Sequence, residues 1–285
     1  MSKSVQKTLR VLLYVFAAIG IIFTGVFIAM QLGLLNVRGA NSARNQSLGI
    51  NTTIPSEVCA DNTKTHCNWN ETPEWNVLKE ALTKDAPVIN DVATKTGVPS
   101  RMIVATVIPE QLRYFTANRE SFKKYFEPLK ILSSLSKFSL GVSGIKQDTA
   151  RAIERYASDP TSQLYPGPGM AALVAYPDNA THDTELYNRL TDAHNHYYSY
   201  LYTALFIKEI QMQWIRAGFD ISNKPDIIVT LFNIGFAASS PNSSPQVGGA
   251  PITLGATTYS YGELGTLFYH SPELEAVFPQ WNSLL

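Results

Sequence analysis

The sequence predicts a mainly α-helical domain that follows a single N-terminal transmembrane helix. Two observations lead to this prediction. Residues 11–37 contain no charged side chain, and from Trp75 onward apolar residues recur at helical spacing, with little of the strict alternation that is typical of strands. The chain has 285 residues and is 45% hydrophobic, so it is long enough to bury a core and too apolar for a disordered protein.

The N-terminal segment has the features of an uncleaved membrane anchor. Val11–Met30 is almost wholly apolar, and twenty residues in a helix rise about 30 Å, which is the thickness of the hydrocarbon core. A cleavable signal peptide has a shorter apolar region of about 7–15 residues and a small-residue cleavage site, which is not found here. Residues 1–10 carry basic but no acidic side chains. We therefore expect a cytoplasmic tail at 1–10, a span at 11–35 in the cell membrane and the rest of the chain outside the cytoplasm.

The charge balance excludes nucleic acid as a partner. Basic and acidic residues number 23 each, and all the acidic ones lie from Glu57 onward, so the part beyond the anchor is mildly acidic. Residues 36–72 are rich in Asn, Ser and Thr and are expected to form a tether. Outside the cytoplasm, Cys59 and Cys67 are candidates for one disulfide; a metal site is less favoured, because only His66 lies beside them.

Helices are expected along most of the remaining chain. Apolar positions from Trp75 to Val92 suit one or two amphipathic helices, and Gly97-Val98-Pro99 is expected to end one helix and start the next. The longest apolar segment contains two charged residues, Lys208 and Glu209. It is therefore predicted to form a central helix of the domain and not a second membrane span. Further helices are predicted at 122–135, 149–156, 183–215 and 226–232, with loops at 160–168 and 239–255.

One set of residues suggests a binding cleft. Glu110 is expected at the end of an apolar helix, where a carboxylic acid holds its proton and can donate it. Gly141 and Gly144, followed by Gln147, would let the backbone approach a ligand closely beside an amide that both donates and accepts hydrogen bonds. Asn233 follows a short apolar helix and could add a second amide. A cleft with one acid and neutral amides suits an uncharged polar polymer, of which a glycan is the obvious example.

The order of these pieces resembles the lytic transglycosylase branch of the lysozyme-like superfamily, over about residues 75–240. The matching pieces are Gly97-Val98-Pro99-Ser100, Glu110-Gln111, Gly141…Gly144-Ile145-Lys146-Gln147 and Phe232-Asn233-Ile234-Gly235. The sequence departs from the family pattern in four places. Gln111 replaces a serine, Lys146 replaces a methionine and Phe232 replaces a tyrosine whose hydroxyl usually helps to bind substrate. The interval from Glu110 to Gln147 is also longer than usual, which an inserted surface loop would explain.

The resemblance implies a lysozyme-like domain at 73–285, with a C-terminal extension, that cleaves the β-1,4 bond between N-acetylmuramic acid and N-acetylglucosamine in peptidoglycan. In that family one glutamate, here Glu110, protonates the leaving oxygen and then takes a proton from the muramyl 6-hydroxyl, which gives a 1,6-anhydro sugar. The resemblance implies no cofactor or metal. It assigns substrate binding to four residues: Gly144, Gln147, Phe232 and Asn233. Glu120 and Asp148 have no family counterpart and are expected to be surface acids.

Two alternatives stay open at this stage. A muramidase on the same fold would add water instead of forming the anhydro sugar, although ordinary glycosidases need a second carboxylate that is not obvious here. A non-catalytic domain that binds glycan, or that serves as a scaffold in the cell envelope, is favoured by the altered residues Gln111 and Phe232. The retained Glu110, Gly141, Gly144 and Gln147 favour an enzyme.

Overall fold

The chain forms two units, Met1–Thr53 and Ile54–Leu285. In the second unit the computed structural model describes residues 68–117, 139–140, 142–178, 180–192, 194–254 and 257–280, and in the first it describes a few helical residues between positions 6 and 24. In these residues, no helix combines the length and apolar character that crossing a membrane requires. Most of the expected span at 11–35, the tether up to residue 67 and the cysteines Cys59 and Cys67 lie outside the described residues.

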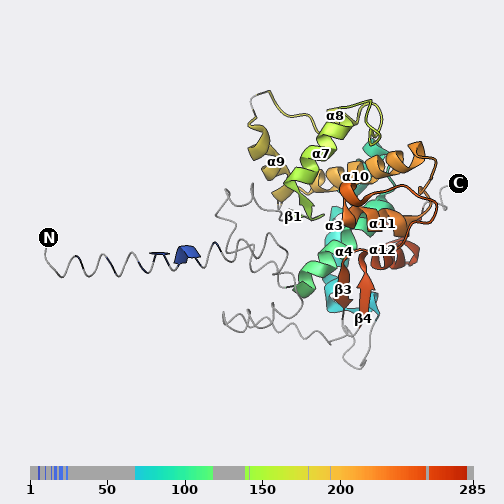
Figure 1. Cartoon of the computed structure of the whole chain (residues 1–285). Coiled ribbons are helices and arrows are strands. Elements are labelled where there is room, and N and C mark those ends of the chain that lie inside the picture. Colours follow the sequence, from blue (N-terminus) through green and yellow to red (C-terminus); the bar gives the residue numbers. More distant parts are fainter. Residues whose placement is uncertain are drawn as a thin grey trace. The chain divides into compact units, whose positions relative to one another are not determined.

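The second unit is mainly helical, as predicted (Figure 1). Two short antiparallel hairpins accompany the helices: β1 (Ser139–Leu140) pairs with β2 (Ile145–Lys146), and β3 (Pro251–Leu254) pairs with β4 (Thr257–Ser260). Single 3-10 turns are formed by η2 (Trp69–Glu71) and η3 (Phe236–Ala238). The helices are α3 (Pro73–Thr96), α4 (Ser100–Ala117), α7 (Gln147–Ala157), α8 (Met170–Leu173), α9 (His182–Thr191), α10 (Tyr197–Arg216), α11 (Pro225–Ile234) and α12 (Tyr261–His270).

The boundary between α3 and α4 lies where the sequence predicted it. The Thr72 hydroxyl caps the start of α3 by accepting a hydrogen bond from the Trp75 amide at 3.3 Å. At the other end, Gly97 has a φ of 72°, the left-handed conformation that ends helices and favours glycine. The buried side chains of α3 recur every three or four residues, so one face of this helix enters the core: Trp75, Leu78, Leu82, Ala86, Ile89, Val92 and Thr96.

Helix α10 is the centre of the second unit. It packs against α3, α4, α7, α9 and α11, and it is buried on almost every side over 199–207. The expected single helical segment at 183–215 is wrong in one respect, because α9 and α10 are separate helices. Asp192 causes the break: its side chain accepts hydrogen bonds from the amides of His194 and Asn195, at 2.8 and 3.0 Å, and so forms a turn.

The C-terminal region packs against the core. Helix α12 contacts α4 and α11, and Gly265 of α12 lies so close to α4 that an added Cβ would be 2.6 Å from the carbonyl oxygen of Ala105. The loop expected at 239–255 is wrong at its end, because β3 begins at Pro251. Neither short hairpin carries a long alternating pattern that could have predicted it.

An acid is buried in α10 without a polar partner. The Glu209 side chain is fully buried, and neither of its carboxylate oxygens has a hydrogen-bond partner among the described residues. This burial raises the pKa of Glu209 well above its usual range. The folded chain therefore holds a proton on Glu209 at pH values where the unfolded chain has lost it.

We expect Glu209→Met to stabilise the protein, and to do so more at pH 8 than at pH 4. Where the folded state binds more protons than the unfolded state, the free energy of unfolding falls as pH rises, and this begins near the ordinary glutamate pKa of about 4.3. Removing the acid should add about 1–3 kcal/mol at pH 8, measured by urea unfolding of the full chain. Glu80→Met, on the exposed face of α3, is the control and should change little. An equal effect of Glu209→Met at both pH values would contradict the expectation.

Candidate functional site

Glu110 lies inside a helix, not at its end. Helix α4 continues through Pro109 as far as Ala117, so the expectation that Glu110 lies at the end of a helix is wrong. The residue is only 4% exposed, and it follows a run of buried residues over 102–108 that are all apolar except Thr106. The apolar surroundings that the sequence predicted for this acid are therefore present, and they come from the whole middle of α4.

Gly144 lies directly against the Glu110 carboxyl group. Its φ of 65° is in the left-handed region, in the tight turn that joins β1 to β2. A Cβ atom added to Gly144 would be 2.3 Å from Glu110 Oε1 and 2.6 Å from Cδ. Only glycine can therefore bring the backbone this close to the acid, and two residues that the sequence singled out separately meet in the structure.

Two further contacts fix the acid and the turn relative to each other. The Gln111 side-chain amide donates a hydrogen bond to the carbonyl oxygen of Val142, which joins α4 to the turn that contains Gly144. Arg113 Nη2 is 2.7 Å from Glu110 Oε1, and this ion pair is largely shielded from solvent, because the Glu110 side chain is 5% exposed. Gln111 thus positions the turn against α4, which is a structural reason for an amide at this place.

Gln147 begins α7, directly after the hairpin. Its side chain is 6% exposed, its Nε2 donates to the carbonyl oxygen of Asp183 at 3.1 Å, and its Oε1 has no partner among the described residues. Gln147 therefore ties α7 to the start of α9. Within the described part of the chain, no hydrogen bond joins it to Glu110.

Phe232 and Asn233 close the end of α11. Phe232 is 8% exposed and packs against Phe206 of α10, with ring centroids 4.9 Å apart. Its place in the core suits an apolar side chain. Asn233 is half-buried, and its Oδ1 accepts a hydrogen bond from the Ala250 amide at 2.8 Å. Helix α11 packs against α4, so the structure brings Asn233's helix beside the helix that carries Glu110.

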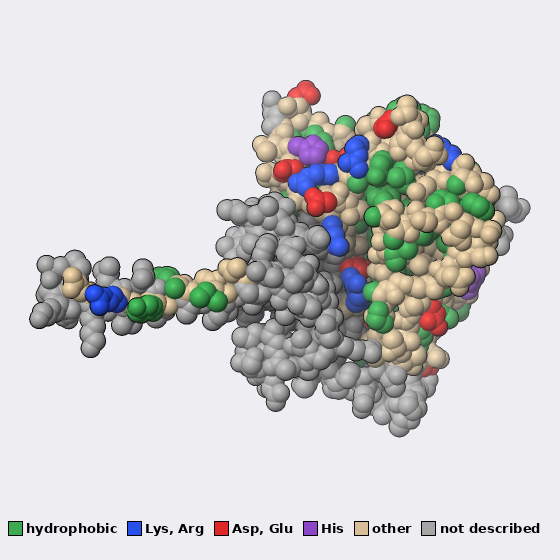
Figure 2. All heavy atoms as spheres, in the orientation of Figure 1, with side chains coloured by type: hydrophobic (Ala, Val, Ile, Leu, Met, Phe, Trp, Pro, Cys, Tyr) green, Lys and Arg blue, Asp and Glu red, His purple; other side chains and the backbone are tan. Residues whose placement is uncertain are grey.

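The acids near Gln147 and α7 differ in their exposure. Asp148 is 83% exposed and forms an ion pair with Arg151 at 2.6 Å, as expected for a surface acid, while Glu120 lies outside the described residues. Acidic, basic and histidine side chains gather over α7 and α9 in Figure 2. Glu154 of α7 is different, because it is nearly buried and accepts hydrogen bonds from the hydroxyls of Tyr176 and Tyr202. These contacts join α7 to α10 and to the segment before α9.

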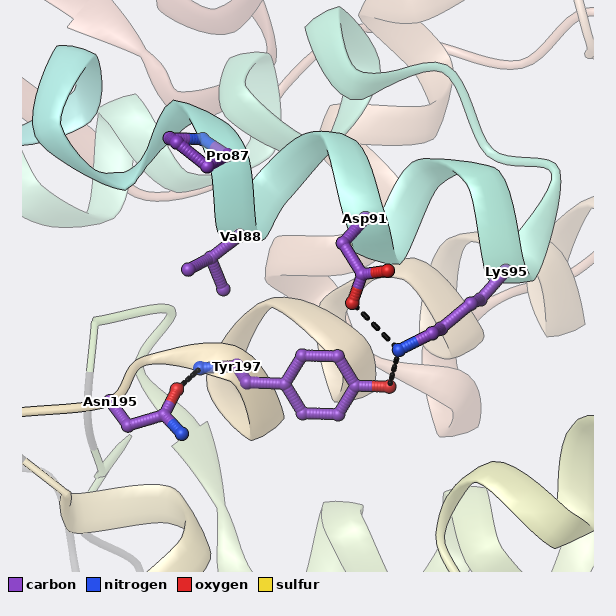
Figure 3. A pocket seen from close by; sticks show the side chains of 6 residues that line it. All are labelled: Pro87, Val88, Asp91, Lys95, Asn195 and Tyr197. Carbon is purple, nitrogen blue, oxygen red and sulfur yellow. Dashed lines mark hydrogen bonds and ion pairs between the residues drawn. The ribbon is translucent and has the colours of Figure 1, made fainter.

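A hollow of about 450 Å³ lies away from Glu110, between α3 and the start of α10 (Figure 3). Lys95 donates hydrogen bonds there to Asp91 at 2.7 Å and to the Tyr197 hydroxyl at 3.4 Å. The hollow contains none of the motif residues. It is lined by Pro87, Val88, Asp91, Lys95, Asn195 and Tyr197.

His196 lies next to this hollow and forms an ion pair with Asp85. Its ring atom Nδ1 is 2.6 Å from the carboxylate atom Oδ2 of Asp85. The hydrogen bond to Asp85 raises the pKa of His196. Burial raises the pKa of Asp85, but hydrogen bonds from His196 and Tyr200 outweigh that effect, so the net change is a lower pKa. The pair therefore joins α3 to α10 most strongly at mildly acidic pH, where both groups are charged.

Arg113 is the residue near Glu110 that sequence reasoning missed. The signal was present, because residues three apart on a helix are neighbours and Arg113 follows Glu110 at that spacing. Gly249, whose added Cβ would be 2.9 Å from Asn233 Oδ1, was also missed. That contact crosses from one loop to a distant helix end, so no local pattern could reveal it.

Comparison of the chain with protein-family models, with curated proteins and with solved structures finds no match.

Proposed function

We propose that this chain is a membrane-anchored peptidoglycan lytic transglycosylase whose lysozyme-like domain faces away from the cytoplasm. The observation that carries the proposal is the contact between Gly144 and the buried carboxyl group of Glu110. It joins two motif pieces that lie more than thirty residues apart in the sequence. Such a contact is required if both pieces belong to one active site.

In this mechanism Glu110 acts twice on one glycan strand. It first donates its proton to the oxygen that links N-acetylmuramic acid to the leaving N-acetylglucosamine. It then takes the proton from the muramyl 6-hydroxyl, and that oxygen attacks the anomeric carbon to close the 1,6-anhydro ring. A single acid suffices because the attacking oxygen belongs to the substrate, whereas a hydrolase must activate water.

The ion pair between Arg113 and Glu110 favours a second candidate function. Arg113 Nη2 lies 2.7 Å from Glu110 Oε1 and so occupies an oxygen of the carboxyl group that would have to reach the glycosidic oxygen. A lytic transglycosylase would need substrate binding to move Arg113 away from the acid. A domain that binds glycan without cleaving it would need no such movement.

Glu110→Gln tests the proposal. We expect this variant to release muropeptides from purified sacculi at least about 100-fold more slowly than the unaltered full chain, because the amide can neither donate nor take up the proton. Asp148→Asn is the matched control and should retain activity, because Asp148 is an exposed acid beside Gln147. Mass spectrometry of the released fragments gives the second measurement, since a 1,6-anhydro end is lighter than a hydrolysed end by one water.

Three results would change the proposal. Undiminished release by Glu110→Gln would exclude Glu110 as the catalytic acid. Release of fragments with ordinary reducing ends would identify a muramidase. Binding of the unaltered chain to sacculi without any release would identify a glycan-binding domain.

A further inference from the structure

The turn between β1 and β2 covers one side of the Glu110 carboxyl group, and other elements hold this turn in place. It is tied to α4 by the hydrogen bond from the Gln111 side chain to the carbonyl oxygen of Val142. It is also tied to α10, because the buried Ser143 hydroxyl donates to the carbonyl oxygen of Ser199 at 3.0 Å. Moving the turn off the acid would therefore break contacts with two helices.

Arg113 contacts the same carboxyl group from a position closer to solvent. Its Nη2 atom is 2.7 Å from Glu110 Oε1, and its side chain is 21% exposed, whereas that of Glu110 is 5% exposed. The guanidinium stands at the end of a long side chain with several rotatable bonds. Of the two groups that lie on the acid, the guanidinium is therefore the one that can move with the smaller change in the fold.

The proposed reaction requires Arg113 and Glu110 to separate. A general acid must come within about 2.6–3.2 Å of the oxygen that it protonates, and a shielded carboxyl group paired with a guanidinium leaves little room for that contact. A guanidinium that leaves such a carboxylate gives up a charge-assisted hydrogen bond, which is costly unless another anion takes its place. Separation is therefore easiest when the substrate itself supplies an anion.

We propose that Arg113 makes the site selective for glycan strands that carry carboxylates: it exchanges the Glu110 carboxylate for one on the substrate and so frees Glu110 to react. This inference rests on the proposed function. The peptides attached to the muramyl sugars of peptidoglycan carry carboxylate groups, whereas oligomers of N-acetylglucosamine carry none. The planar guanidinium suits this exchange, because it matches a carboxylate with two parallel hydrogen bonds.

The overall charge of the chain would give the opposite preference. The part of the chain beyond the expected anchor is mildly acidic, so its long-range field repels anionic substrates. A preference for carboxylates must therefore come from a cation at the site, and Arg113 is the cation that contacts the acid.

The test compares purified sacculi with sacculi whose carboxyl groups have been converted to amides. We expect the unaltered full chain to release muropeptides about tenfold more slowly from the amidated sacculi, because Arg113 then finds no anion to exchange for Glu110. Arg113→Gln removes the guanidinium, so its rates on the two substrates should agree within about twofold. Circular dichroism shows whether this variant is folded, and the unaltered chain tests the substrate preference in either case.

Lys95→Gln is the matched control. Lys95 is also paired with an acid one helical turn away, Asp91 at 2.7 Å, but the two side chains are 42% and 47% exposed. The pair lies at the hollow between α3 and α10 and not at Glu110 (Figure 3). This variant should keep the tenfold preference of the unaltered chain.

The outcomes separate this inference from the proposed function. Equal release from both substrates by the unaltered chain would overturn the role of Arg113 and leave the proposed function standing. The same holds if Arg113→Gln keeps the tenfold preference. If the unaltered chain releases nothing from either substrate, the proposed function fails and the inference fails with it.

Discussion

Arg101→Met is expected to lower the free energy of unfolding by about 3–5 kcal/mol. The Arg101 side chain is fully buried in α4, and its guanidinium donates hydrogen bonds to the carbonyl oxygens of Phe268, Tyr269, Ser271, Glu273 and Phe278. Methionine fills a similar volume and donates nothing, so these buried or part-buried carbonyl groups would lose this donor, although that of Phe268 still accepts from the amide and the hydroxyl of Ser271. Urea unfolding of the full chain, followed by circular dichroism, measures the change.

Arg216→Met is the control for this prediction. Arg216 also donates to backbone carbonyls, those of Ser162, Gln163 and Tyr165, but it does so at the exposed end of α10. Water can replace those hydrogen bonds, so we expect a loss of about 1 kcal/mol. Arg101→Lys should lie between the two, because it keeps the charge and loses the planar fork that reaches several carbonyls at once. Equal losses for Arg101→Met and Arg216→Met would show that burial of the carbonyls does not matter.

Gly144→Ala is expected to destabilise the protein and to abolish the proposed activity. The new methyl group would be 2.3 Å from Glu110 Oε1, so either the acid or the turn must move. A shift of about 1 Å in a catalytic group costs on the order of 100-fold in rate. Overpacking and the left-handed backbone together should cost about 2–5 kcal/mol. Release of muropeptides from sacculi and urea unfolding give the two measurements.

Gly218→Ala separates the two causes of this loss. Gly218 has a φ of 85°, close to that of Gly144, but an added Cβ would meet nothing within 4 Å. It should show only the backbone penalty of about 1–2 kcal/mol and should keep full activity. If Gly144→Ala resembled Gly218→Ala in both measurements, Gly144 would not be holding the Glu110 carboxyl group in place.

The sequence predicted those helices whose start and end have local causes. The boundary between α3 and α4 follows from Gly97 and Pro99, and the apolar spacing of α3 gave its buried face. The break between α9 and α10 was missed, although its cause is also local, because apolar residues at helical spacing lie on both sides of Asp192. The periodicity of buried residues is a strong signal, and it outweighed a single turn-forming residue in the prediction.

Other features could not be predicted because they depend on contacts between distant segments. The two hairpins are too short to show an alternating pattern, and α12 gave little sign of its position. Tyr261 at the start of α12 donates a hydrogen bond to the carbonyl oxygen of Thr106, more than 150 residues earlier. Nothing near either residue in the sequence indicates this contact.

By itself the sequence determined that the chain is mainly helical, and it identified Glu110, Gly144 and Gln147 as special, because residue type and spacing are local properties. Only the tertiary structure decided how these residues relate. It placed Gly144 on the carboxyl group of Glu110, turned Gln147 toward α9, and buried Arg101 among the carbonyls of the C-terminal segment. The reason is physical: close packing and the pairing of buried polar groups depend on which segments meet in space, and this is set by the whole core.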